Sequence, residues 1–370
     1  MTIQELRCYS DCVTITWQDG HRSEYHATWL LDNDPAHRDA RTGQRLIDIA
    51  DLPEDLTIEG GCYSADDGLV QLSWSDLRCT AFPIDWLLDH CPRAEHVESA
   101  QVQLWDHSTA DLLNRLSYAE VLDSSTVRLD WLETLATLGI AFLTGVPVDK
   151  DKVLEVAALI GWVRDTNYGR VFDVRAVPDP NNLAYTGLAL GLHTDNPYRD
   201  PVPGLQVLHC LRAGAEGGVS LFVDGLAVAD ALRSEDPEAF HVLASTPVRF
   251  EFADSASHLW AERPIIQLSD CGRVEAVHYN SRSIAPLRLP LKDIPEFYRA
   301  YRAFARLLRD ESLVVSTALT EGELVAFDNR RVLHGRTAFY SADARWLQGC
   351  YLDHDGLRSR IAVLKRHGHD

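Results

Sequence analysis

The amino-acid sequence predicts a mainly β protein with flanking helices, an antiparallel sandwich or barrel preceded by a small β-rich domain. Two observations predict this fold class. The second half of the chain consists mostly of short apolar runs separated by Gly, Pro and Asp, with few helical patterns between them. The first part also consists of short strands and turns, and its character changes near Pro92. We therefore expect a small domain over residues 1–95 and a large one over residues 96–370.

Two runs in the small domain alternate between apolar and polar residues, Val13–Trp17 and Leu69–Trp74. The first run ends in the turn sequence Gln18-Asp19-Gly20-His21. Residues 83–89 are expected to form one or two helical turns. No internal repeat with a period of about 20 to 50 residues is apparent.

The large domain opens with helical periodicity from Tyr118 to Gly139, interrupted at residues 124–126. Ser124 or Ser125 is expected to cap a helix that ends at Thr137. A buried strand over residues 139–143 follows, and then a helix over residues 152–160 with Asp149 as its cap. Further strands are predicted over residues 205–211, 219–223, 248–252, 274–279, 324–327 and 347–352. Further helices are predicted over residues 226–232, 237–243 and 294–308.

The composition excludes several classes of protein. Apolar residues make up 46% of the chain and charged residues 24%, which are ordinary values for a globular protein. The formal net charge of −20 argues against nucleic acid or an anionic membrane as partner, because both require a basic surface. No window approaches the roughly 18 apolar residues that span a bilayer, and the N-terminus has no signal-like stretch, so we expect a cytoplasmic protein. The eight cysteines form no C-x-x-C pair and are expected to be reduced core residues.

One set of side chains predicts a metal site. His193 and Asp195 form an H-x-D pair, and residues i and i+2 of a strand point to the same face. His334 follows the apolar run 324–327, and Arg345 comes eleven residues later. Two histidines and one carboxylate on a β scaffold are the ligand set of the non-haem Fe(II) oxygenases, which leaves coordination positions open for 2-oxoglutarate and O₂. An arginine beside them suits the far carboxylate of such a cosubstrate. Each histidine taken alone is more simply a structural residue.

Long stretches of the sequence resemble the γ-butyrobetaine hydroxylase family. They are WLLDN (29–33), HTDNPYRDPVPGLQVLHCL (193–211), EGGVSLFVDG (216–225), LVAFDNRRVLHGRTAF (324–339) and RWLQGCYLDHDGL (345–357). The family consists of Fe(II)/2-oxoglutarate oxygenases with a double-stranded β-helix, or jelly-roll, core and a small N-terminal domain. The resemblance implies that His193, Asp195 and His334 bind iron and that Arg345 binds the distal carboxylate of 2-oxoglutarate. Ser220 stands where related oxygenases often place a hydroxyl near that carboxylate.

The resemblance also implies an aromatic cage for a trimethylammonium group. The matching positions are Tyr168, Phe172, Tyr185 and Tyr351, with Phe172 in place of an expected tryptophan. A quaternary ammonium has no hydrogen-bond donor, so ring faces are what can select it. The anionic end of such a substrate needs donors, and the candidates are Asn182, Asn196, Asn280 and Arg282.

One departure from the family affects the predicted substrate. The segment after WLLDN reads Asn33-Asp34-Pro35-Ala36-His37 and lacks the cysteines of the family's structural zinc site, so structural zinc is not expected. This loss favours the branch that hydroxylates 2-(trimethylamino)ethylphosphonate at the carbon bearing phosphorus. γ-Butyrobetaine hydroxylation, which gives carnitine, is the alternative. A non-catalytic jelly-roll protein that binds a betaine is a further alternative, and a homodimer is expected from the resemblance.

Overall fold

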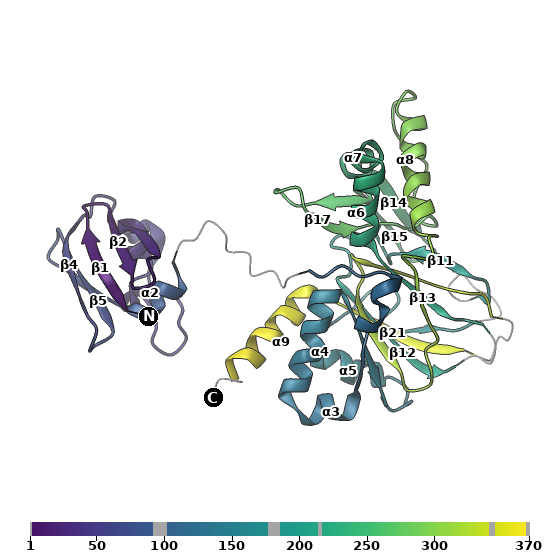
Figure 1. Ribbon diagram of the computed structural model, residues 1–370, viewed down its shortest axis with the longest axis horizontal. Helices are drawn as coiled ribbons and strands as arrows, with labels where there is room; N and C mark the ends of the chain where they lie inside the picture. Colours follow the sequence, from purple (N-terminus) through teal and green to yellow (C-terminus); the bar gives the residue numbers. More distant parts are fainter. Residues whose placement is uncertain (1, 92–101, 177–185, 214–216, 340–344, 368–370) are drawn as a thin grey trace. The chain divides into compact units, whose positions relative to one another are not determined.

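The computed structural model describes residues 2–91, 102–176, 186–213, 217–339 and 345–367. The chain divides into two compact units, Met1–Glu98 and Ser99–Asp370, and each is described by itself (Figure 1). Among the described residues, no helix is long and apolar enough to cross a membrane.

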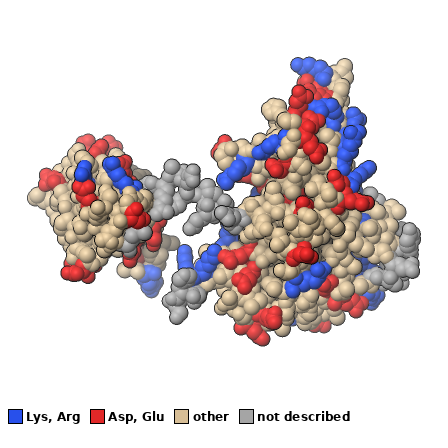
Figure 2. Space-filling view, viewed as in Figure 1, with Lys and Arg blue, Asp and Glu red and all other residues tan. Residues whose placement is uncertain are grey.

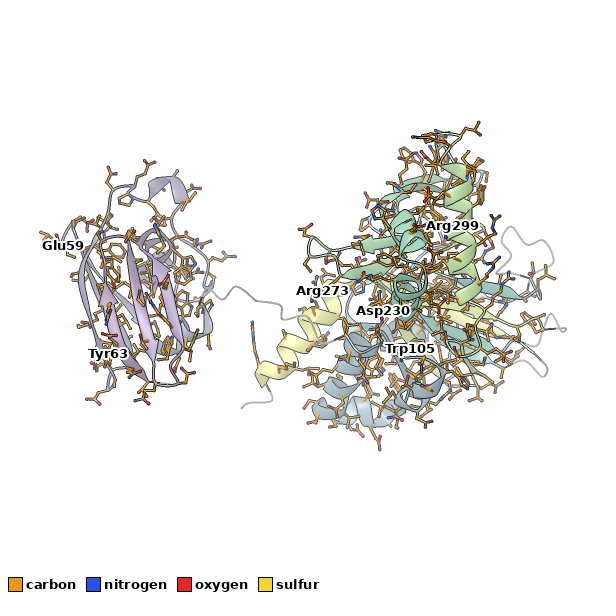
Figure 3. All side chains as sticks on the ribbon, turned by 45° about the horizontal axis from the view of Figure 1, so that its top comes forward. Glu59, Tyr63, Trp105, Asp230, Arg273 and Arg299 are labelled. Carbon is orange, nitrogen blue, oxygen red and sulfur yellow. The ribbon has the colours of Figure 1, made fainter. Side chains whose placement is uncertain are left out.

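The first unit contains two three-stranded antiparallel sheets, each followed by a short helix. The first sheet consists of β1 (Ile3–Cys8), β2 (Cys12–Trp17) and β3 (Arg22–His26), and α1 (Ala27–Asp32) follows it. The second consists of β4 (Ile58–Ser64), β5 (Leu69–Trp74) and β6 (Cys79–Pro83), and α2 (Ile84–Asp89) follows it. Short 3₁₀ turns occupy Pro35–His37 and Ile49–Asp51. Figure 3 labels Glu59 and Tyr63, which belong to β4.

The two sheets of this unit repeat one another. Trp17 is fully buried and its indole N–H donates to Ser23 Oγ at 2.7 Å. Trp74 is equally buried and donates to Thr80 Oγ1 at 3.0 Å, at the same spacing along the chain. The motif Trp-Leu-Leu-Asp then recurs in both helices, at 29–32 and 86–89. This repeat was not predicted, because its period is longer than the roughly 20 to 50 residues of common repeat proteins.

The second unit contains two sheets with a common core, as predicted for a jelly roll. The seven-stranded sheet has the order β10-β21-β12-β19-β8-β7, with β9 paired to β21. Its strands are β7 (Arg115–Ser117), β8 (Ile140–Thr144), β9 (Val163–Arg164), β10 (Phe172–Val174), β12 (Leu205–Arg212), β19 (Leu324–Asp328) and β21 (Trp346–Leu352). The four-stranded sheet has the order β11-β20-β13-β18. Its strands are β11 (Leu190–His193), β13 (Ser220–Asp224), β18 (Val315–Thr317) and β20 (Val332–Arg336).

Alternating side chains of the large sheet enter two different cores. Phe142 and Phe327 face the small sheet, where their rings contact Phe222 at centroid distances of 5.9 and 5.8 Å. Their neighbours Ala141 and Ala326 face the other way, against the helices. Because both faces are covered, these strands read as continuous apolar runs rather than as alternating ones.

Helices cover the outer face of the large sheet and one flank of the unit (Figure 1). The sheet is covered by α3 (Tyr118–Asp123), α4 (Ser125–Leu138), α5 (Lys152–Ile160) and α9 (His354–His367). The flank consists of α6 (Gly225–Glu235), α7 (Pro237–Ser245), α8 (Ile294–Leu307) and the strands β14 (Val248–Ala253), β15 (His258–Arg263), β16 (Ile266–Leu268) and β17 (Val274–Val277). A 3₁₀ segment, His107–Leu112, follows Trp105, which is labelled in Figure 3 and donates its indole N–H to Leu138 O.

The mainly β fold with flanking helices is confirmed, and the local predictions differ in detail. Ser124 caps α4 by accepting from the Val127 amide, as predicted. The predicted cap Asp149 is wrong: the residue before α5 is Asp151, which has a φ of 64° and no side-chain cap. No disulfide joins the eight cysteines, all of which lie in described segments, but only Cys91, Cys210 and Cys350 are buried.

The charges are unevenly distributed on the surface. Acidic side chains are scattered over both units, whereas Lys and Arg gather along the outer edge of α8 (Figure 2). Arg299 of α8, labelled in Figure 3, pairs with Asp236 and Glu238 of the neighbouring α7 region. On the face that Figure 2 shows, the acidic excess behind the net charge of −20 does not gather at one place and does not locate a binding site.

Candidate functional site

A cavity of about 490 Å³ lies between the two sheets of the second unit. Strands β10, β12 and β21 of the large sheet and β11, β13 and β20 of the small sheet contribute to its walls, and the end of β14 closes one side. Eleven of the thirteen predicted site residues line this cavity. The other two, Asn182 and Tyr185, lie outside the described residues. The lining predicted residues are Tyr168, Phe172, His193, Asp195, Asn196, Ser220, Asn280, Arg282, His334, Arg345 and Tyr351.

Sheet register brings the two predicted histidine ligands together. His193 ends β11 and stands directly opposite His334 in the antiparallel pair β11–β20. Their rings lie 4.3 Å apart between centroids. Asp195 completes the cluster, and one ligand atom from each of the three residues lies within 4.8 Å of the others. In the described part of the chain this is the one group of three or more His, Cys, Asp or Glu residues with such spacing.

The route by which Asp195 reaches the cluster differs from the prediction. We expected His193 and Asp195 to share one face of a strand, but β11 ends at His193 and Asp195 lies in the following loop. Its carboxylate still reaches both imidazoles, with Oδ1 3.3 Å from His193 Nε2 and Oδ2 3.8 Å from His334 Nε2.

The donor set fits a divalent metal. The Nδ1 of His193 lies 2.8 Å from the Gly191 carbonyl, so Nδ1 carries the proton and Nε2 offers a lone pair to the cluster. Burial and the neighbouring His193 lower the pKa of His334 to about 3, which keeps that imidazole neutral. Burial raises the pKa of the Asp195 carboxyl, but the two histidines and a hydrogen bond from Tyr351 outweigh this and hold the pKa well below its usual value. Two neutral imidazoles and a carboxylate are what Fe(II) ligation requires.

A cationic group lies at another wall of the cavity. Arg345, at the start of the β21 segment, is 7% exposed and donates to Ser220 Oγ across 3.4 Å. The chain passes close to it at Gly218, which has a φ of 67° and where a Cβ would lie 2.8 Å from Arg345 Cδ. Arg336 lines the same cavity, and sequence reasoning missed it. Burial together with the charges of Arg345 and Arg282 lowers the pKa of Arg336 to about 10, so it remains a cation at neutral pH.

Aromatic rings form two groups on the cavity wall. Phe172 of β10 and Tyr351 of β21 lie 4.9 Å apart between centroids, and Tyr351 Oη donates to Asp195 Oδ2 at 2.8 Å. Tyr168 shares a 3.0 Å hydrogen bond with Tyr198, and both rings contact Phe252 at centroid distances of 6.0 and 5.3 Å. The prediction missed Tyr198 and Phe252. Tyr198 lies in the same motif as the H-x-D pair, so its proximity in sequence was a usable signal.

The predicted anion-binding residues differ in how many of their polar groups already have a hydrogen-bond partner in the protein. Asn196 has a φ of 54°, and its Oδ1 accepts from Tyr198 at 2.7 Å. Its buried Nδ2 has no hydrogen-bond partner among the described residues and lines the cavity. Asn280, by contrast, donates to Thr194 O at 3.1 Å and accepts from the Arg282 amide at 3.1 Å. Arg282 lines the cavity with an exposed side chain, which places it toward solvent.

Comparison with known proteins identifies the family. The model of the taurine catabolism dioxygenase TauD, TfdA family matches residues 104–351. The γ-butyrobetaine dioxygenase of Pseudomonas sp. (strain AK-1) is 37% identical over 364 residues, which cover 97% of this chain and 95% of the relative. The chain belongs to the TauD, TfdA dioxygenase family. The γ-butyrobetaine dioxygenase of Homo sapiens is 30% identical over 368 residues, which cover 95% of this chain and 94% of that protein.

The solved structures agree on the fold. An asparagine oxygenase, solved in complex with Fe(II), 3-hydroxyasparagine and succinate, has a TM-score of 0.51 and 21% identity, covering 62% of this chain and 80% of its own. The family match confirms the predicted enzyme class, a 2-oxoglutarate-dependent dioxygenase. With the His193, Asp195 and His334 cluster in place, it also confirms the predicted cofactor Fe(II) and cosubstrate 2-oxoglutarate.

Proposed function

We propose that this dioxygenase hydroxylates a zwitterion that carries a trimethylammonium group, and that γ-butyrobetaine, which gives carnitine, is its substrate. The observation that supports this most is the cavity itself, which combines the metal cluster with aromatic rings and with the Nδ2 of Asn196, a donor that has no partner among the described residues. The two γ-butyrobetaine dioxygenase relatives favour this substrate over 2-(trimethylamino)ethylphosphonate. Their enzymatic character also favours a catalyst over a non-catalytic betaine-binding protein.

In this proposal His193, Asp195 and His334 hold Fe(II). When bound, Fe(II) with 2-oxoglutarate and O₂ supplies an oxidative decarboxylation to succinate and CO₂ and the insertion of one oxygen atom into a substrate C–H bond. Arg345, steadied by Ser220, binds the distal carboxylate of 2-oxoglutarate. A guanidinium suits this task because it donates two parallel hydrogen bonds to a carboxylate.

The aromatic rings would bind the trimethylammonium group. Each favourable ring contributes roughly 0.5 to 2 kcal/mol to a desolvated quaternary ammonium. Tyr351, whose ring contacts Phe172, adjoins the metal cluster, because it donates to Asp195. Tyr168 and the two rings that it contacts, Tyr198 and Phe252, provide a second aromatic wall. Holding the cation against rings fixes which methylene of the substrate faces the metal.

The other end of the substrate would meet donors. Asn196 Nδ2 is buried without a partner in the described structure, and Arg282 lines the same cavity. These two groups are also the reason to keep the phosphonate as a second candidate. A phosphonate carries up to two negative charges and three acceptor oxygens, so it gains more from a guanidinium than a carboxylate does.

A substrate panel tests the proposal. We expect kcat/KM to rank γ-butyrobetaine above 2-(trimethylamino)ethylphosphonate and trimethyllysine, with succinate formed in step with hydroxylated product. His193→Ala is expected to abolish both products, whereas His241→Ala, an exposed histidine on α7, should leave them unchanged. A clear preference for the phosphonate would reverse the choice of substrate. Turnover that survives in His193→Ala would overturn the proposed site. The expected homodimer is a separate proposal, which light scattering of the purified chain tests.

A further inference from the structure

We infer that Asn329 is a positioning residue that fixes the backbone of Asp195 and thereby sets the geometry of the metal cluster. The inference rests on the proposed role of Asp195 as an iron ligand. It concerns a residue that lies outside the cavity lining and far from Asp195 in sequence.

Asp195 needs such support because its backbone lies beyond the end of β11. The residue before it is well held, since the Thr194 amide donates to Tyr279 O at 2.8 Å and the Thr194 carbonyl accepts from Asn280. Among the described residues, no strand partner continues this pattern at Asp195. A ligand carried by a loop is less precisely placed than one carried by a strand, unless its backbone groups are bonded elsewhere.

The side chain of Asn329 provides both bonds. Its Oδ1 accepts from the Asp195 amide at 2.7 Å, and its Nδ2 donates to the Asp195 carbonyl at 2.9 Å. The same Nδ2 donates to Pro203 O at 3.1 Å, so one amide group joins two points of the 195–203 loop. Asn329 is fully buried, where an amide group that loses its partners is costly to leave unpaired.

The turn that carries Asn329 is itself fixed on both sides. Before it, the Asp328 amide donates to Gly139 O at 2.7 Å, and the Asp328 carboxylate pairs with His354 at 2.9 Å. After it, Arg331 forms a buried ion pair with Asp224, at 2.7 Å between Nη2 and Oδ2. The same turn leads directly into β20, the strand of His334. Asn329 therefore couples the strand that carries one ligand to the loop that carries another.

Metal affinity is the measurement that tests this role. We would titrate Co(II) into the metal-free full-length protein and follow its d–d absorption. Partners that orient metal ligands from outside the coordination sphere typically contribute about 10- to 100-fold to affinity, so Asn329→Ala is expected to weaken Co(II) binding by that factor. Asn329→Asp keeps an acceptor for the Asp195 amide but places a carboxylate oxygen against two carbonyls, so it should also weaken binding.

Two controls separate positioning from general loss of stability. Val153→Ala removes buried volume from α5, in the core between the large sheet and its covering helices. This variant should have a lower melting temperature and unchanged Co(II) affinity. Amide hydrogen exchange gives an internal control. In the metal-free wild type, the Asp195 amide should exchange slowly, and in Asn329→Ala it should exchange faster while the Thr194 amide stays protected.

The outcomes distinguish this inference from the proposed function. If Asn329→Ala binds Co(II) as tightly as the wild type, or if the Asp195 amide of the wild type exchanges like an exposed one, the positioning role is wrong. Should Asn329→Ala fail to fold, Asn329→Asp and the wild-type exchange measurement decide instead. If Asp195→Ala itself retains full Co(II) affinity, the proposed metal site is wrong rather than the role of Asn329.

Discussion

The metal cluster and the ligand-binding walls of the cavity differ in how far the protein satisfies its own polar groups. At the cluster, His193 is oriented by Gly191 O, and the Asp195 carboxylate accepts from Tyr351. On the walls, the contacts are looser: Arg345 has a 3.4 Å bond to Ser220, and the Asn196 Nδ2 has no partner in the described structure. Two of the three cluster residues, His193 and Asp195, are thus held by protein groups before any ligand binds, although the buried Nδ1 of His334 has no partner among the described residues. The walls keep donors for the cosubstrate and substrate to use.

The largest expected effect comes from removing a donor that serves a ligand. Arg345→Ala leaves a buried cosubstrate carboxylate without its cation, which typically costs about 2 to 5 kcal/mol. We therefore expect the KM for 2-oxoglutarate to rise by about 30- to 4,000-fold, because each 1.4 kcal/mol is tenfold. Metal affinity should stay near that of the wild type, because the arginine makes no described contact with the cluster. Steady-state kinetics in 2-oxoglutarate and a Co(II) titration measure the two quantities.

The matched control for this variant is Arg302→Ala, an exposed arginine on α8 that should change neither quantity. Arg345→Lys keeps the charge and loses the paired donors, so its KM should fall between the other two. An unchanged KM in Arg345→Ala would assign the cosubstrate to Arg336 instead, which lines the same cavity.

The sequence predicted the chemistry of the cluster better than its geometry. His193 and His334 could be expected to meet because both adjoin strand patterns, and their pairing in β11–β20 agrees with this. The place of Asp195 in a loop could not be read from H-x-D spacing, because a strand end is set by tertiary contacts such as those of Asn329. Phe252 and Arg336 were missed for a similar reason. Phe252 lies on β14, which pairs with β15 outside the two jelly-roll sheets, and Arg336 lies on β20. Only tertiary packing turns each side chain toward the cavity.

A second, smaller effect is expected at the metal cluster. Tyr351→Phe keeps the ring against Phe172 but removes the 2.8 Å hydrogen bond to Asp195. Losing this hydrogen bond raises the pKa of the Asp195 carboxyl, and metal affinity should fall by about 10-fold. The KM for the trimethylammonium substrate should change little, because the ring face remains. A Co(II) titration at several pH values and substrate kinetics at saturating metal separate the two roles of Tyr351. A large rise in substrate KM with unchanged metal affinity would contradict this division.

The smallest expected effect tests the aromatic wall. Tryptophan has the strongest ring quadrupole of the three aromatic side chains, so Phe172→Trp should bind a trimethylammonium group more tightly by at most about 1 kcal/mol, or roughly 2- to 5-fold in KM. The Phe172 ring already packs on the backbone of β21, where a Cβ at Gly349 would lie 2.6 Å from it, so the larger ring must extend into the cavity. Inhibition by a neutral analogue, in which carbon replaces the quaternary nitrogen, provides the control. Tighter binding of the charged ligand alone would support recognition of the cation by the ring face. An equal increase in affinity for the neutral analogue would contradict it and show that position 172 contributes only apolar contact.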